Sequence, residues 1–135
     1  MNTIAGHIVD VVARQIKKGI LYIDGGKIVN FEASEAVPDQ YIIPGFVDLH
    51  THAAQFNQRG LGLDLQLLEW LNTYTFPTEM QFADPELAQR TAAFVLDQLL
   101  AHGTTTAAVF ASVHPVSVDA FMREALQRTL QPTLI

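Results

Sequence analysis

The stretch Pro44-Gly45-Phe46-Val47-Asp48-Leu49-His50-Thr51-His52 decides the fold. It has the pattern of a turn followed by a short strand that ends in a His-x-His pair. Side chains alternate along a strand, so Phe46, Asp48, His50 and His52 are predicted to share one face. At a rise of roughly 3.3 Å per residue the two histidines lie about 7 Å apart along the strand, within reach of one metal ion. The pattern predicts a metal-binding strand whose other face is covered by helices.

Composition excludes several classes of function. The chain has 135 residues, 8 basic and 14 acidic side chains, and a formal net charge of −6. No basic run exceeds Lys17-Lys18, so neither nucleic acid nor an anionic membrane is an expected partner. The chain contains no cysteine, which excludes disulfides and thiolate metal ligands. It shows no signal-peptide pattern and no apolar run near the roughly 18 residues of a membrane span. We therefore expect a cytoplasmic globular protein.

Residues 1–43 are predicted to form β-strands. The run 8–12 is short and β-branched, while 20–23 and 27–31 flank Asp24-Gly25-Gly26, a strong hairpin turn signal. A polar connection then leads to Pro44. We expect a domain boundary here, with a β module over 1–43 and an α/β pattern over 44–135.

The segment 53–83 shows no strand pattern and is much longer than a usual βα connection. Within it, Asp64 is the predicted N-cap of a short amphipathic helix through Leu67, Leu71 and Tyr74, which Pro77 is expected to end. Connections of this length are commonly functional.

The remaining residues alternate between helix and strand signals. Asp84-Pro85-Glu86 opens a helix that His102-Gly103 closes, and 104–111 is typical of a buried parallel strand. Ser117 is the predicted cap of a second helix, and 133–135 begins another strand. Alternating strands and helices predict a parallel sheet. Since the pattern shows no terminal cap, we expect a truncated part of a longer α/β barrel.

Pro-Gly-Phe-Val-Asp-x-His-x-His resembles the first barrel strand of the amidohydrolase superfamily. Those metal-dependent hydrolases have a (β/α)8 TIM-type barrel beside a small β-sandwich. The run from His50 to Phe56, the Leu67-Leu68-Glu69-Trp70-Leu71 block and Tyr74-Thr75-Phe76-Pro77-x-Glu79 are more specifically similar to the guanine deaminase family, and 102–114 continues the likeness. The resemblance implies sandwich strands over 1–43 and the first βα units of the barrel over 44–135.

The resemblance also implies roles for four residues. His50 and His52 match two ligands of one catalytic zinc ion, Gln55 matches a glutamine that contacts the guanine ring, and Trp70 matches a wall of the purine pocket. The family's remaining groups, which are a histidine and an aspartate ligand, a further histidine and a glutamate proton shuttle, belong to later strands. No catalytic residue is therefore expected within these 135 residues. The implied reaction is zinc-dependent hydrolysis of guanine to xanthine and ammonia, in an enzyme that is a homodimer when complete.

Two other functions remain open. One is a different amidohydrolase, acting on another aminated heterocycle or a cyclic amide, although Gln55 and the Leu-Leu-Glu-Trp-Leu block favour guanine. The other is a non-catalytic fragment or interaction module, which the missing ligand strands favour. Asp48 either orients the histidines or fills the barrel floor. His114 follows a strand and is expected to belong to a turn more readily than to the metal site.

Overall fold

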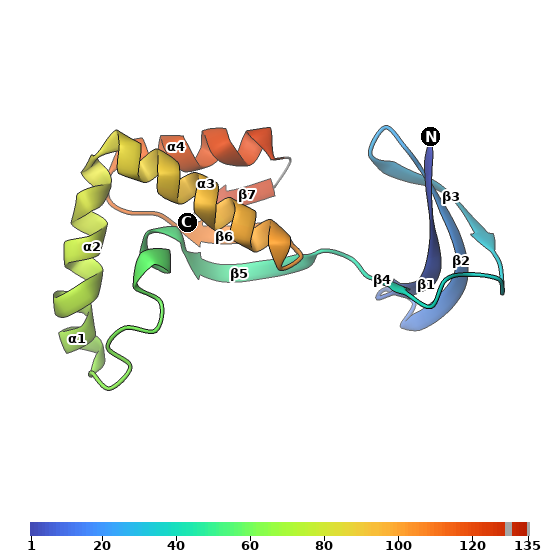
Figure 1. Ribbon diagram of the computed structural model, residues 1–135, viewed down its shortest axis with the longest axis horizontal. Coiled ribbons are helices and arrows are strands. Elements are labelled where there is room, and N and C mark those ends of the chain that lie inside the picture. The colour runs from blue at the N-terminus through green and yellow to red at the C-terminus, as the bar shows by residue number, and fades with distance from the viewer. Residues whose placement is uncertain (129–130, 135) are drawn as a thin grey trace. The chain divides into compact units, whose positions relative to one another are not determined.

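The chain folds into two compact units, Met1–Pro44 and Gly45–Ile135 (Figure 1). The structure is a computed structural model that describes residues 1–128 and, by backbone alone, 131–134. Each unit has its own sheet.

The first unit is a four-stranded sheet with the order β3-β2-β1-β4. Its strands are β1 (Asn2–Asp10), β2 (Gln15–Asp24), β3 (Lys27–Ala33) and the short β4 (Tyr41–Ile42). The predicted hairpin is β2–β3, an antiparallel pair. Gly25 and Gly26 both have positive φ angles, of 55° and 76°, in its turn. A turn of this kind favours glycine because a Cβ is strained in the left-handed region.

The strand predicted at 8–12 instead begins at Asn2 and ends at Asp10. The reason is local, because Asp10 Oδ1 accepts the backbone N–H of Ala13 at 2.9 Å. This side-chain turn draws Val11 and Val12 out of the strand, and both are exposed. The β-branched residues therefore lie in the connection to β2.

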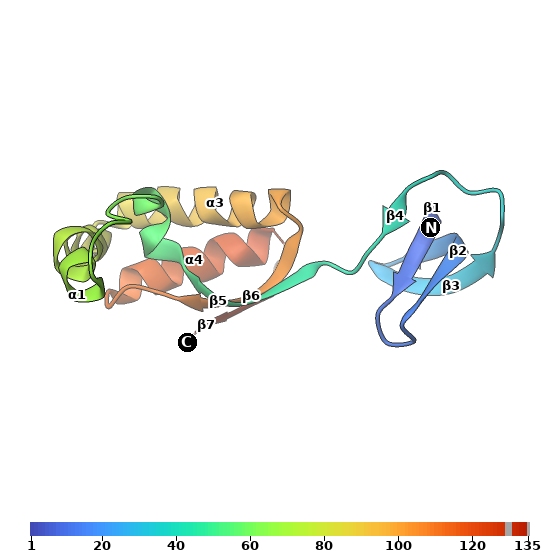
Figure 2. The same ribbon diagram turned by 90° about the horizontal axis from the view of Figure 1, so that it is seen from below.

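The second unit is a parallel sheet of β5 (Phe46–His52), β6 (Thr104–Phe110) and β7 (Gln131–Leu134), in the order β5-β6-β7. Helices α3 (Pro85–Ala101) and α4 (Pro115–Gln127) cover one face of it (Figure 2). The parallel α/β arrangement confirms the prediction from the alternating pattern. Ile135, at the end of the strand predicted over 133–135, lies outside the described residues.

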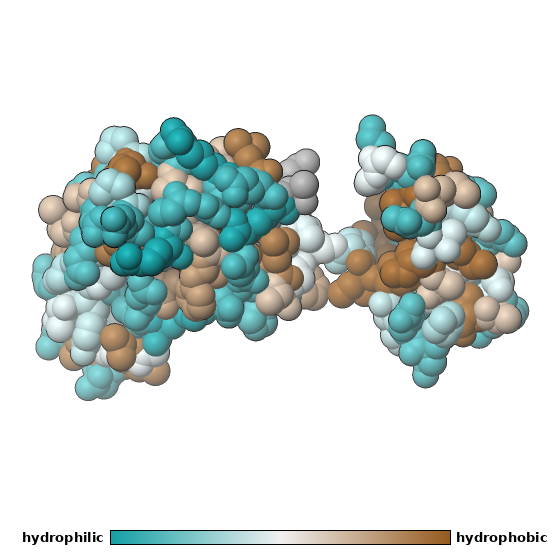
Figure 3. Space-filling view, turned by 45° about the horizontal axis from the view of Figure 1, so that its top comes forward, coloured by the Kyte–Doolittle hydropathy of each residue, from teal (hydrophilic) through white to brown (hydrophobic). Residues whose placement is uncertain are grey.

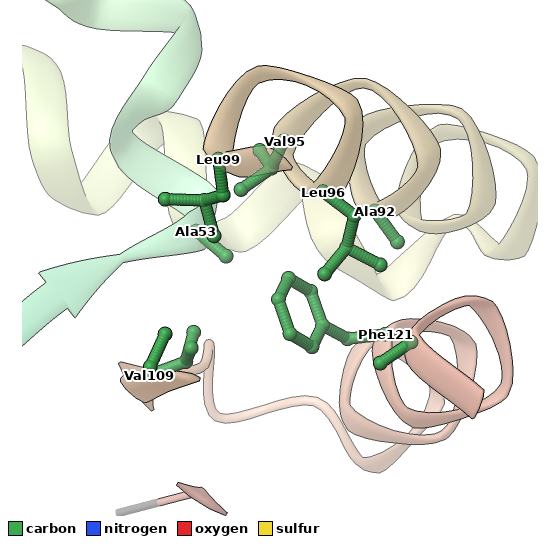
Figure 4. Close-up of a cluster of buried hydrophobic side chains, with 9 residues drawn as sticks. Ala53, Ala92, Val95, Leu96, Leu99, Val109 and Phe121 are labelled. Atoms are coloured by element: carbon green, nitrogen blue, oxygen red, sulfur yellow. The ribbon is translucent and has the colours of Figure 1, made fainter. Parts of the chain in front are cut away.

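The core of this unit lies between the sheet and the two helices (Figure 4). Val95 and Leu96 of α3 are fully buried, and Phe121 of α4 projects into the same cluster. The outer faces of α3 and α4 are largely hydrophilic (Figure 3), with exposed ion pairs such as Arg90–Glu86 and Arg123–Asp119. No helix within the described ranges is long and apolar enough to cross a bilayer.

Local capping signals explain where the two long helices begin. At α3, Asp84 Oδ1 accepts the backbone N–H of Glu86 at 2.9 Å, as predicted. The predicted start of α4 was wrong, because the helix begins at Pro115 rather than after Ser117. Proline suits the first helical position, where its missing N–H leaves no bond unmade. Ser117 instead donates its hydroxyl to the carbonyl oxygen of His114 at 2.9 Å.

The segment 53–83 is mostly helical rather than an open loop. It contains η1 (Ala53–Gln58), α1 (Leu67–Trp70), the π-helical η2 (Leu71–Thr75), α2 (Phe76–Met80) and η3 (Gln81–Ala83). Asp64 is not the N-cap, since α1 begins at Leu67 after Gln66. Pro77 does not end the helix either. Phe76 N–H bonds to the carbonyl of Leu71 five residues back, and Pro77 lies in the first turn of α2, where proline is tolerated.

Candidate metal centre

His50 and His52 bring their Nε2 atoms together at the end of β5. These two nitrogens lie 3.0 Å apart, and the ring centroids lie 5.1 Å apart. Two nitrogens that each bind a tetrahedral ion at about 2.05 Å are themselves about 3.3 Å apart. The two imidazoles therefore converge as a pair of ligands to one ion would, and the donor set fits zinc.

The ring of Phe110, the last residue of β6, supports both histidines. It lies 4.6 Å from each imidazole centroid, stacked on His52 at an interplanar angle of 10° and tilted by 38° against His50. His52 and Phe110 are register partners in the sheet. No sequence pattern marks Phe110 as a site residue, although the strand predicted over 104–111 contains it.

A register shift in β5 changes the position of Asp48. Asp48 pairs with Ala107 and Thr51 with Val109, so β5 contains one residue more than β6 between these pairs. Such a bulge interrupts strict alternation. Asp48 therefore pairs with buried Ala107, whereas His52 pairs with Phe110, and the shared face that alternation predicts for Asp48 and the histidines does not follow across the bulge. The Oδ1 of Asp48 accepts the backbone N–H of His50 at 3.0 Å, so Asp48 holds the main chain of His50 rather than its ring.

Gln55 links the histidine pair to α2. Its Nε2 lies 3.1 Å from His52 Nδ1 and donates to Glu79 Oε1, also at 3.1 Å. Glu79 is thus joined to His52 through one carboxamide, a connection that the sequence motif alone did not indicate. Burial lowers the pKa of His52 below its usual range, the neighbouring His50 lowers it further, and the charge of Glu79 opposes both.

Two clefts meet at His52 and Gln55. One, of about 280 Å³, is also lined by Leu71, Thr75, Phe76, Glu79, Phe110 and Ala111. The other, of about 330 Å³, is lined by residues of η1 and extends to Gly60, Leu61 and Trp70. Trp70 Nε1 donates to the carbonyl of Leu61 at 3.0 Å, which fixes the indole along this second cleft. Of the four predicted site residues, His50, His52 and Gln55 form one cluster, whereas Trp70 lies at the far side of a cleft.

The other histidines lie apart from this cluster. His102 Nδ1 contacts the carbonyl of Gln98 at 2.8 Å at the end of α3, and His7 packs on Tyr41 in the first unit. His114 occupies the N-cap position of α4, and its buried Nε2 has no partner among the described residues. Within that same part of the chain, no group of three or more histidine or acidic side chains could hold a metal ion. His50 and His52 are therefore the candidate ligands among the described residues.

Comparison with known proteins shows similarity in both sequence and structure. Guanine deaminase of Escherichia coli (strain K12) is 44% identical over 125 residues, which is 83% of this chain and 28% of the relative. The solved structure of an E. coli guanine deaminase matches with a TM-score of 0.85 and 34% identity, over 99% of this chain and 37% of that structure. A guanine deaminase from C. acetobutylicum, with guanine bound in its active site, matches with a TM-score of 0.83 and 28% identity, over 98% and 35% of the two chains.

The chain is therefore similar to guanine deaminases and spans 28% of the length of the E. coli relative. The sequence model of the amidohydrolase family matches residues 41–135, which include both histidines and both clefts. The chain belongs to the amidohydrolase family.

Proposed function

We propose that the protein is a guanine aminohydrolase, which converts guanine and water to xanthine and ammonia, and that this chain contributes its N-terminal ligand pair. The observation that carries the proposal is the His50–His52 pair, whose Nε2 atoms lie 3.0 Å apart within the region shared with guanine deaminases. The site residues His50, His52, Gln55 and Trp70 are assigned as part of this proposal.

These residues divide into metal ligands and substrate contacts. His50 and His52 hold zinc through Nε2, and Phe110 keeps their rings in place by stacking. When bound, zinc acts as a Lewis acid and lowers the pKa of a water molecule to about 7. Gln55 lines both clefts and contacts a flat heterocycle through its carboxamide. Trp70 closes the far side of the second cleft with an aromatic surface suited to a purine.

The proposal extends to the architecture of the complete protein. The sheet of the first unit is part of a composite β-sandwich, with a boundary at residue 43, and the second unit begins a (β/α)8 barrel. The C-terminal ends of barrel strands form the active site of such folds, and His52 is the last residue of β5. The third histidine, the aspartate ligand and the proton-transferring groups belong to later strands. We further propose a cytoplasmic homodimer.

The test is to express the protein from its natural reading frame and to measure zinc content and ammonia release together. We expect one zinc ion per chain and stoichiometric xanthine and ammonia from guanine. His50→Ala and His52→Ala should each lose the metal, whereas His102→Ala, at the end of α3, should retain it. Zinc binding without ammonia release from guanine would reject the substrate assignment. Turnover of another aminated heterocycle or a cyclic amide would then identify a different amidohydrolase.

A further inference from the structure

The carboxamide of Gln55 has two partners at its nitrogen end. Nε2 carries two hydrogens, and one is directed to Glu79 Oε1 and the other to His52 Nδ1. An ionised carboxylate can only accept hydrogen bonds, so the Gln55 atom facing Glu79 has to be the nitrogen. This orientation requires His52 Nδ1 to be the unprotonated ring nitrogen. The Oε1 end of Gln55 has no hydrogen-bond partner among the described residues.

Ligation through His52 Nε2 demands the opposite tautomer. A neutral imidazole that binds a metal through Nε2 carries its proton on Nδ1, and that N–H needs an acceptor. The atom 3.1 Å from Nδ1 is then required to be an oxygen. One atom of Gln55 cannot both accept from Nδ1–H and donate to Glu79. The Gln55–Glu79 bond and metal ligation by His52 Nε2 therefore exclude one another.

We propose that the Gln55 carboxamide turns end for end when His52 ligates the metal, and that Glu79 favours the unturned orientation. This inference rests on the proposed zinc ligation by His52. After the turn, Oε1 of Gln55 accepts the Nδ1–H of His52 and the bond to Glu79 is lost. The Nε2 group then takes the place that Oε1 had, where the structure provides no protein partner. Gln55 thereby changes from a hydrogen-bond acceptor to a donor toward its substrate.

The consequence concerns the class of substrate. Gln55 lines both clefts, so its free end is the polar group beside His52 that a heterocycle meets. With the metal bound, that end donates two hydrogens. The loaded site therefore selects a heterocycle that presents a carbonyl oxygen or an unprotonated ring nitrogen to Gln55. Glu79 acts on substrate binding only through Gln55 and is a positioning residue.

The test follows the side-chain amide of Gln55 by NMR in the protein expressed from its natural reading frame. Spectra are recorded after chelation and after adding zinc alone, and Gln55→Leu assigns the signal. Without zinc the two hydrogen bonds slow exchange of the amide hydrogens. With zinc, exchange should become about 30-fold faster, because both hydrogen bonds of Nε2 are lost and each slows exchange about 5-fold. Gln58 is the matched control, because its buried Nε2 donates to Thr75 Oγ1 at 2.9 Å and should not respond. An unchanged Gln55 signal would overturn the inference.

A second experiment needs only the zinc-loaded protein. The variant Gln55→Glu/Glu79→Gln keeps an acceptor for His52 Nδ1–H but removes the donor toward substrate. Against Glu79→Gln alone, we expect equal zinc content, a KM for guanine raised about 10-fold and a smaller change in kcat. An equal KM in the two variants would mean that Gln55 presents an acceptor, and the inference would be wrong. The NMR experiment contains no guanine, so a response to zinc without guanine turnover would reject the substrate and leave the inference standing.

Discussion

The imidazole of His52 lies face to face with the ring of Phe110, with centroids 4.6 Å apart and planes inclined by 10°. The two residues are register partners on neighbouring parallel strands, so the backbone bonds of the sheet fix their separation. The orientation of the His52 ring is thus determined by a hydrocarbon side chain on the next strand.

Replacing Phe110 by leucine should weaken zinc binding while leaving the fold intact. Leucine retains most of the apolar surface but cannot stack, and aromatic stacking is worth about 0.5–1.5 kcal/mol per pair. We expect the dissociation constant for zinc to rise about 3- to 10-fold, measured by competition with a chelator. Phe94→Leu is the control, since Phe94 is an exposed ring on α3, near Arg59 rather than the histidines. Equal affinities for the two variants would contradict the supporting role of Phe110.

Stability should decrease in mild acid through His52. Burial, with a contribution from His50, holds the pKa of His52 in the folded state below its ordinary value of 6.5. The unfolded chain therefore binds more protons between these two pKa values, and the free energy of unfolding falls as the pH drops below about 6.5. Above about 6.5 this contribution is fully present. Urea unfolding of the chelated protein at about pH 7.5 and about pH 5.5 measures the decline, which His52→Gln should reduce. An undiminished decline in that variant would assign the effect to other groups.

Gly62→Ala should lower the free energy of unfolding more than Gly60→Ala, because only Gly62 packs against aromatic rings of the cleft wall. Both glycines have positive φ angles, 79° at Gly60 and 65° at Gly62, so both substitutions strain the backbone by about 1–2 kcal/mol. A Cβ at Gly62 would lie 2.6 Å from the Tyr74 ring and 3.0 Å from the Trp70 ring, whereas one at Gly60 meets nothing within 4 Å. We expect a further loss of about 1–3 kcal/mol for Gly62→Ala, measured by urea unfolding. Equal losses would show that the two rings move aside freely.

Two leucines of α3 should differ in their contribution to stability, because only one of them lies in the core of the second unit. Leu96 is 0% exposed and Leu100, one turn later, is 37% exposed. Leu96→Ala leaves a cavity between the helices and the sheet and should lower the free energy of unfolding by about 2–5 kcal/mol. Leu100→Ala should lower it by less than about 1 kcal/mol, since its side chain already contacts solvent. Chemical denaturation of both variants provides the comparison, and similar losses would place the core elsewhere.

Local signals predicted the parts of the fold that depend on neighbouring residues. The N-cap at Asp84, the proline at the start of α3 and the Gly25-Gly26 turn each act within a few positions, and the structure contains all three. The bulge in β5 was not predicted, because no glycine marks its position. A bulge also exists only relative to a partner strand, which here is β6. The continuation of the helix past Pro77 was missed for a related reason, since it depends on the wide turn before the proline.

The site could be predicted only where its residues are close in sequence. His50, His52 and Gln55 lie within six positions, and the structure brings them together. Glu79 and Phe110 reach the same cluster from α2 and β6, which are distant in the chain. No periodicity within one element reports such contacts. The sequence motif contained Glu79 without indicating that its partner is Gln55.

The π-helical turn at Leu71–Thr75 makes this segment sensitive to its length. A turn closed five residues back holds one residue more than an α-helical turn, and each residue rotates a helix by about 100°. Deleting a single residue there would turn Glu79 away from Gln55 while leaving every side chain of the site unaltered. Among active members of the amidohydrolase family, insertions and deletions of one residue in this turn should therefore be rarer than substitutions at the same positions.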